Sequence, residues 1–124
     1  MRKALFIPIA LVALAALALV TANAYRVPTI EHSFVDERPE NVATVEYVVS
    51  GLRCRGTAVG LARQIAELPG MVSITAYART RTAIIEYDPT EVSPDAIRET
   101  FERPMVHEGE EYQVFSTVSE RALD

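Results

Sequence analysis

The sequence predicts an α+β domain in which two helices cover one face of an antiparallel sheet, preceded by an N-terminal hydrophobic helix. Three observations lead to this prediction: an apolar run near the start of the chain that only Pro8 interrupts, segments that alternate apolar and polar residues as strands do, and two segments with apolar residues at helical spacing. The composition of the 124 residues, with 49% in the apolar set, 23% charged and one cysteine, is typical of one small globular domain plus a hydrophobic segment.

The first 24 residues have the three parts of an export signal. Arg2 and Lys3 form a positive start, residues 4–20 are apolar, and residues 22–24 are the small-x-small triplet at which such signals are cut. The apolar run approaches the roughly 20 residues that span a bilayer, so residues 1–24 are either a signal peptide or an uncleaved membrane anchor. Both alternatives place the rest of the chain in the cell envelope, in the periplasm or on the outer face of the inner membrane.

Residues 25–42 combine two prolines with four acidic residues and show no sustained period, which predicts an extended linker. His32 lies in this linker and is expected at the surface. Setting aside Arg2 and Lys3 leaves ten basic residues against 17 acidic ones, a formal charge of −7 for residues 25–124. A domain of this charge is not expected to bind nucleic acid.

The predicted domain covers residues 43–119. It begins with a strand over 43–49, in which every second residue is apolar and the others are mostly polar. Residues 57–68 have apolar residues at helical spacing, and a Pro-Gly pair ends this helix. Residues 71–78 and 82–87 alternate again on either side of a polar turn, so these two strands are expected to form a hairpin.

A second helix is predicted to begin at Pro94, with Ser93 as its N-cap, and to end near Arg103, because a proline follows. After a polar stretch, residues 112–118 are predicted to form the last strand, and residues 120–124 a tail. The resulting β-α-β-β-α-β order is that of the ferredoxin-like, or split βαβ, arrangement.

Residues 44–115 resemble the heavy-metal-associated domain. The resemblance rests on the loop Ser50-Gly51-Leu52-Arg53-Cys54-Arg55-Gly56-Thr57, on Leu68-Pro69-Gly70-Met71, on Ile84-Ile85-Glu86-Tyr87-Asp88-Pro89 and on Val92-Ser93-Pro94. The family includes copper chaperones, the N-terminal modules of copper-transporting ATPases and periplasmic mercury-binding proteins, which a short exported chain resembles most. The resemblance implies a ferredoxin-like fold and the binding of Cu(I) or Hg(II) between the two thiolates of a Gly-Met-x-Cys-x-x-Cys loop.

The chain departs from this motif at two positions. Cys54 matches the first cysteine, but Thr57 stands at the second, and Leu52 replaces the methionine. Thr57 offers a hard oxygen and is expected to be an N-cap, so the loop alone does not supply two soft ligands. In the family, the turn after the second helix lies beside the metal loop. The resemblance therefore implies Cys54, Met105 and His107 as the ligands of Cu(I) or another soft ion.

Other arrangements of Cys54 stay open. Cys54 of two paired molecules, or Cys54 and a thiol of a metal-transporting or envelope partner, would also bridge one soft ion. Arg53, Arg55 and the start of the following helix favour the thiolate, which suits redox or covalent chemistry. In a third interpretation the domain has lost metal binding and is a membrane-tethered interaction subunit of an envelope complex. A Cys54–His107 hydrolase has no obvious orienting residue, so we do not expect an enzyme.

Overall fold

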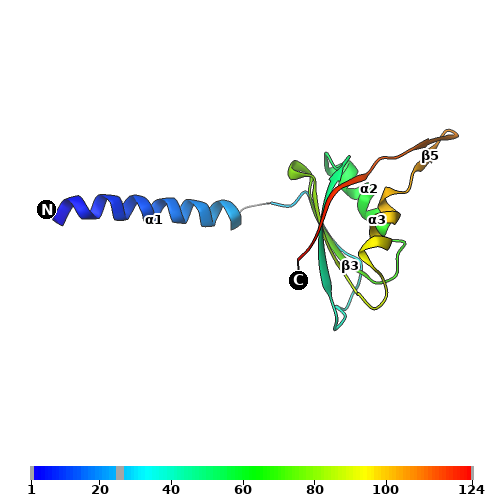
Figure 1. The fold of residues 1–124 in the computed structure, drawn as a ribbon, viewed down its shortest axis with the longest axis horizontal. Helices are drawn as coiled ribbons and strands as arrows, with labels where there is room; N and C mark the ends of the chain where they lie inside the picture. Colours follow the sequence, from blue (N-terminus) through cyan, green and yellow to red (C-terminus); the bar gives the residue numbers. More distant parts are fainter. Residues whose placement is uncertain (1, 25–26, 124) are drawn as a thin grey trace.

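The computed structural model describes residues 2–24 and 27–123, and the side chains of residues 7–18 within the first helix. It is an α+β chain with an antiparallel sheet, as the sequence predicts (Figure 1). Its helices are α1 (Arg2–Ala24), α2 (Arg55–Ile65), α3 (Pro94–Glu102) and the short 3-10 turn η1 (Ala78–Thr80). Its strands are β1 (Ile30–Ser33), β2 (Ala43–Ser50), β3 (Met71–Tyr77), β4 (Thr82–Tyr87), β5 (Met105–His107), β6 (Glu110–Tyr112) and β7 (Ser116–Ala122).

The main sheet has the strand order β1-β3-β4-β2-β7, and every neighbouring pair is antiparallel. Strand β4 therefore separates β2 from β3, although α2 connects these two strands in the chain. Ile85 on β4 lies opposite both Val45 on β2 and Ile74 on β3, so these three side chains share one face of the sheet. Helices α2 and α3 both cover this face (Figure 1).

The core lies between this face and the two helices. Its fully buried side chains come from the strands, from the two helices and from the residue just before β7, and include Val45, Val49, Leu61, Ile65, Ile74, Ile85, Ile97 and Phe115. Tyr47 occupies the middle, where its ring meets Phe101 edge-on at 5.2 Å and its hydroxyl donates to the carbonyl of Pro94 at 2.8 Å. Burial, with the neighbouring Glu120 carboxylate, raises the pKa of Tyr47. Packing and polar contacts thus hold helix α3 to the sheet; besides the Tyr47 hydrogen bond, the Glu102 carboxylate accepts from the N–H of Thr117 on β7 at 2.9 Å, and Arg98 forms a salt bridge with Glu120.

Helix α1 has apolar side chains around its circumference, and the larger ones that the structure describes are 59–70% exposed. In the part of the chain that the structure describes, no helix is both long and apolar enough to cross a membrane. The side chains of Arg2 and Lys3 and of the predicted cleavage triplet at 22–24 lie outside this part. So do residues 25 and 26 at the start of the predicted linker, and residue 124 at the end of the predicted tail.

The linker predicted over residues 25–42 contains one strand of the sheet. Strand β1 pairs with β3, from Ile30 opposite Ala76 to Ser33 opposite Ser73. Ile30 and the following Phe34 pack against the core, and the burial of these two side chains explains why the segment joins the sheet. Because three of the four strand residues are exposed, the segment shows little of the alternation typical of longer strands.

The last strand lies further along the chain than predicted. Strand β7 runs from Ser116 into the predicted tail and pairs with β2, whereas Tyr112 belongs to the hairpin β5–β6. The polar stretch expected as a loop makes the turn of this hairpin, where Glu108 and Gly109 have φ of 54° and 82°. Positive φ at both central residues is what the type I′ turn of a two-residue hairpin requires. Tyr112 and Val114 alternate with polar residues as strand residues do, but their side chains are 48% and 38% exposed. Their alternation therefore does not mark a face of the sheet that packs against the core.

Candidate functional site

The loop that carries Cys54 is held in place by its first two residues. Gly51 has φ +97°, and a Cβ atom there would lie 2.0 Å from the carbonyl oxygen of Val114, so only glycine fits beneath the segment that leads into β7. Leu52, at the position where the resembled family has methionine, is completely buried in the core. The chain then emerges, and Arg53 and Cys54 are exposed. Gly51 and Leu52 therefore fix the position of the loop, and the Cys54 thiol is exposed to solvent.

Cys54 is itself the N-cap of α2, with extended backbone at φ −155° and ψ 177°. The prediction that Thr57 is the N-cap is wrong by three residues. Thr57 occupies the third helical position, and its hydroxyl accepts hydrogen bonds from the backbone N–H groups of Arg53 and Cys54 at 2.9 and 3.0 Å. This reciprocal arrangement is a capping box, with a thiol in the place of the usual N-cap oxygen.

The same contacts act on the thiol. The pKa of Cys54 lies below its usual value because the N–H of Thr57, the Thr57 hydroxyl and the N–H of Gly56 all donate toward the sulfur. The Thr57 oxygen lies 3.8 Å from Sγ and 2.9 Å from the Cys54 carbonyl oxygen, and its single proton can serve either one. A larger share of the thiol is therefore ionised near neutral pH than in an ordinary exposed cysteine.

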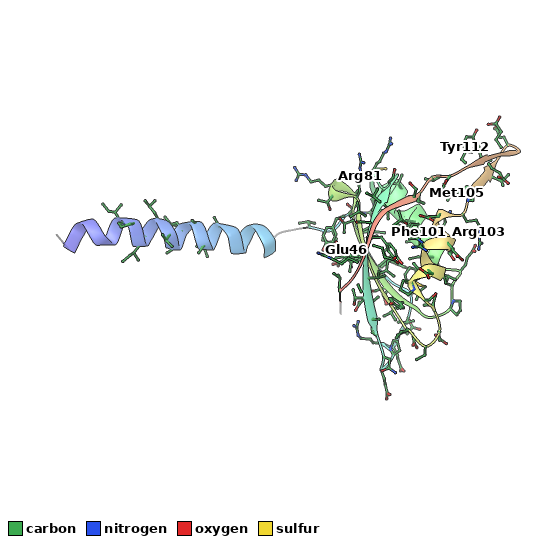
Figure 2. All side chains as sticks on the ribbon, in the orientation of Figure 1. Glu46, Arg81, Phe101, Arg103, Met105 and Tyr112 are labelled. Carbon is green, nitrogen blue, oxygen red and sulfur yellow. The ribbon has the colours of Figure 1, made fainter. Side chains whose placement is uncertain are left out.

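The other two predicted ligands lie on the β5–β6 hairpin, which projects away from the sheet and helices (Figures 1 and 2). Met105 and His107 are two residues apart in β5 and so share one face of that strand. His107 Nε2 lies 4.0 Å from Oε1 of the adjacent Glu108. Among the described residues, no group of three or more His, Cys, Asp and Glu side chains is placed to hold a metal ion. The structure brings Cys54 together with Thr57, and the three-residue metal site stays a prediction.

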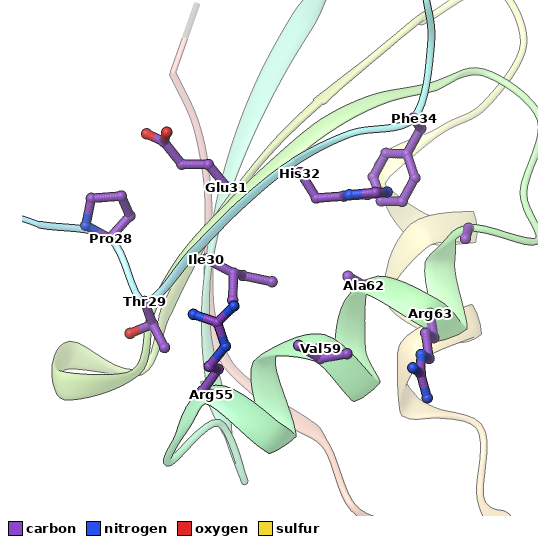
Figure 3. Close-up of a pocket in the computed structure, with 11 residues that line it drawn as sticks. Pro28, Thr29, Ile30, Glu31, His32, Phe34, Arg55, Val59, Ala62 and Arg63 are labelled. Carbon is purple, nitrogen blue, oxygen red and sulfur yellow. The ribbon is translucent and has the colours of Figure 1, made fainter.

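A groove of about 450 Å³ lies beside this loop, between β1 and α2 (Figure 3). Its lining includes Ile30, His32 and Phe34 from the β1 side and Arg55, Val59 and Ala62 from α2. The His32 ring meets Phe34 edge-on at 4.9 Å, so this exposed histidine borders the groove. The groove was not predicted from the sequence, because the alternating residues that line it, Ile30, His32 and Phe34, lie in a segment expected to be a linker.

Comparison of the chain with protein-family models, with curated proteins and with solved structures finds no match.

Proposed function

We propose that the chain is an exported ferredoxin-like domain of the heavy-metal-associated type, in which the Cys54 thiolate binds or transfers a soft metal ion such as Cu(I) or Hg(II). The fold part of this proposal is supported by the β3-β4-β2-β7 order within the sheet and by two helices on one face, which is the arrangement of a split βαβ domain. Strand β1 is then an addition at the β3 edge.

One observation carries the metal proposal: the only cysteine is exposed at the start of α2, and its pKa is lowered. The thiolate is the form that binds soft metals. Thr57 contributes a hard oxygen that is already engaged with the backbone, so the second soft ligand comes from elsewhere: from another molecule, as a partner thiol or Cys54 of a second copy, or from Met105 and His107. Two exposed arginines flank the thiolate and disfavour a bare cation, but they favour an anionic metal–thiolate complex that delivers its metal by ligand exchange.

Titration of the purified chain with Cu(I) against a competing chelator tests the proposal. If the second ligand is external, the wild type should retain Cu(I) at one ion per two chains, or one per chain when a small thiol is supplied, and Cys54→Ser should retain none. Thr57→Cys should bind one ion per chain without added thiol, because the replaced hydroxyl lies 3.8 Å from Cys54 Sγ. Equal retention by the wild type and Cys54→Ser would sink the metal proposal.

The same titration decides whether the hairpin takes part. If Met105 and His107 complete the site, Met105→Leu and His107→Ala should each weaken Cu(I) retention, since each removes a soft or borderline donor. Unchanged retention in both variants removes these two residues from the site and leaves an external thiol as the second ligand.

Thiol exchange is a second candidate, favoured by the lowered pKa and the flanking arginines. In this reaction the Cys54 thiolate attacks one sulfur of a substrate disulfide, forms a mixed disulfide and releases the other sulfur as a thiolate. The candidate requires rapid alkylation of Cys54 well below pH 8. A rate profile with the midpoint of an ordinary exposed thiol would exclude it.

The location of the domain is part of the proposal. A helix that is apolar on all sides is stable only when other apolar material surrounds it, and the described side chains of α1 have no such cover. We infer that α1 acts in a membrane, as an export signal or as a retained anchor, and that residues 27–123 lie at the outer face. N-terminal sequencing of the natural protein distinguishes the two alternatives: a start at Tyr25 indicates cleavage, and a start at Met1 indicates an anchor.

A further inference from the structure

The chain enters the domain at one well-defined point. The Thr29 N–H donates to the carbonyl oxygen of Ala76 at 2.7 Å, and the Thr29 hydroxyl accepts from the N–H of Ala78 at 2.9 Å. Thr29 is therefore attached to the end of β3 and the start of η1. The last residue of α1, Ala24, is five residues upstream, so at most about 18 Å of chain separates α1 from this point.

Three exposed arginines surround this entry point. Arg79 and Arg81 belong to η1 and its cap, and Arg55 lines the same groove as Thr29 (Figure 3). We call Arg55, Arg79 and Arg81 the tether-end arginines. The acidic residue of this groove, Glu31, points away from Arg55 on the other side of β1 (Figure 3). Positive charge thus collects at the entry point of a domain that is acidic overall.

Of the nine arginines in residues 27–123, six form no salt bridge, namely the tether-end arginines and Arg53, Arg63 and Arg103. Arg38, Arg98 and Arg121 each form a salt bridge with a glutamate or aspartate. Among the described residues, none of the tether-end arginines takes part in one. Unpaired cations gathered at one place indicate an anionic partner outside the chain.

We propose that the tether-end arginines bind anionic phospholipid headgroups of the membrane in which α1 lies. This inference rests on the proposed membrane location of α1 and on its retention as an anchor. The short connection keeps the tether-end arginines close to the end of α1, and therefore close to the membrane surface. The headgroup layer extends several ångströms beyond the hydrocarbon core on each side, so long arginine side chains can reach it. The negative remainder of the domain is repelled by the same surface, so the two effects together orient the domain with its tether end toward the lipid.

Arginine-specific modification by phenylglyoxal, read by mass spectrometry, tests the contact on the full chain. The chain is reconstituted in nanodiscs of phosphatidylcholine, or of phosphatidylcholine and phosphatidylglycerol in equal parts. Phosphatidylglycerol should slow modification of the tether-end arginines by roughly fivefold each. Arg103 is also exposed and without a salt bridge among the described residues, but lies on the opposite side of the domain from Arg81 (Figure 2), so its rate should not change.

Two further measurements make the test specific. High salt, about 0.5 M NaCl, should restore rapid modification, because exposed ionic contacts are screened. The double variant Arg79→Gln/Arg81→Gln should lose most of the protection of Arg55, whereas Arg98→Gln/Arg103→Gln, with the same change in charge at helix α3 and its C-cap, should keep it. Equal protection of Arg55 in both double variants would overturn the proposal.

Flotation with vesicles separates the failure of this inference from the failure of the membrane location. A chain that does not float with phosphatidylcholine vesicles refutes the location of α1, and this inference with it. A chain that floats but shows the same modification rates in both lipids refutes the headgroup contact alone. Protection that appears only after an acidic protein is added would also overturn the proposal, since it would assign the arginines to a protein partner.

Discussion

Replacement of Gly51 by alanine should destabilise the domain strongly, for two separate reasons. The backbone at Gly51 has φ +97°, where a residue with a Cβ atom costs about 1–3 kcal/mol. The added Cβ would also lie 2.0 Å from the Val114 carbonyl oxygen, so the backbone must move, and forced overpacking of this kind costs roughly another 1–3 kcal/mol. We therefore expect the free energy of unfolding to fall by about 2–6 kcal/mol.

Gly60→Ala is the matched control. Gly60 lies within α2, and a Cβ atom there would meet nothing within 4 Å. The same substitution should therefore stabilise the domain by about 0.5–1 kcal/mol, because alanine favours the helix. Urea unfolding followed by circular dichroism measures both variants, and the midpoints should move in opposite directions at an unchanged slope.

The alkylation rate of Cys54 adds a local measurement, because a displaced Gly51 changes the start of the loop that carries the thiol. Gly51→Ala should alter this rate even under conditions in which the domain remains folded, and Gly60→Ala should not. If the urea midpoint of Gly51→Ala lies within error of that of the wild type, the loop moves aside freely, and Gly51 does not fix the position of the Cys54 loop.

Three further substitutions test the contacts around the site and the core. Thr57→Val removes one of the donors that lower the pKa of Cys54, so the midpoint of the alkylation rate against pH should move up, whereas Thr57→Ser should leave it in place. Arg38→Gln removes the main cause of the lowered pKa of Glu86. A carboxylate with a lowered pKa stabilises the fold at any pH above its ordinary pKa of about 4.3, and this stabilisation is lost as the pH falls through the lowered pKa. The variant should therefore be less stable than the wild type at pH 7, and the difference should vanish in acid. Tyr47→Phe should cost about 1 kcal/mol of unfolding free energy in urea, because it removes the buried hydrogen bond to the first residue of α3, and no measurable loss would refute that role.

Features set by neighbouring residues were predictable from the sequence. Ser93 caps α3 as predicted, and its hydroxyl accepts from the N–H of Ala96 at 3.2 Å. Residues 71–77 and 82–87 form the predicted hairpin. Both depend on local patterns, namely a cap followed by proline and two alternating segments around a short turn, and no distant contact competes with either.

Features that depend on contacts between distant residues were not predictable from the sequence. The alternation of Tyr112 and Val114 is genuine strand periodicity, but residue 112 pairs with residue 105, and the edge beside β2 is taken by a later segment. At the site, the loop that carries Cys54 was expected from the sequence, whereas the position at which α2 starts was not. Thr57 looks like an N-cap by residue type, and only the folded backbone shows that its hydroxyl reaches back to Cys54 from inside the helix.

The β5–β6 hairpin also determines where the chain tolerates interruption. All residues from Met105 to Tyr112 are exposed, and a lone two-stranded hairpin is marginally stable in water. Its amides should therefore exchange with solvent while those of the sheet stay protected, since the hairpin opens without unfolding the core. A foreign segment inserted between Glu108 and Gly109, or a cut there, leaves the packing of both helices untouched. The tip of the hairpin is thus the position for an affinity tag or a split-protein junction that keeps Cys54 and the N-terminal segment in their natural sequence.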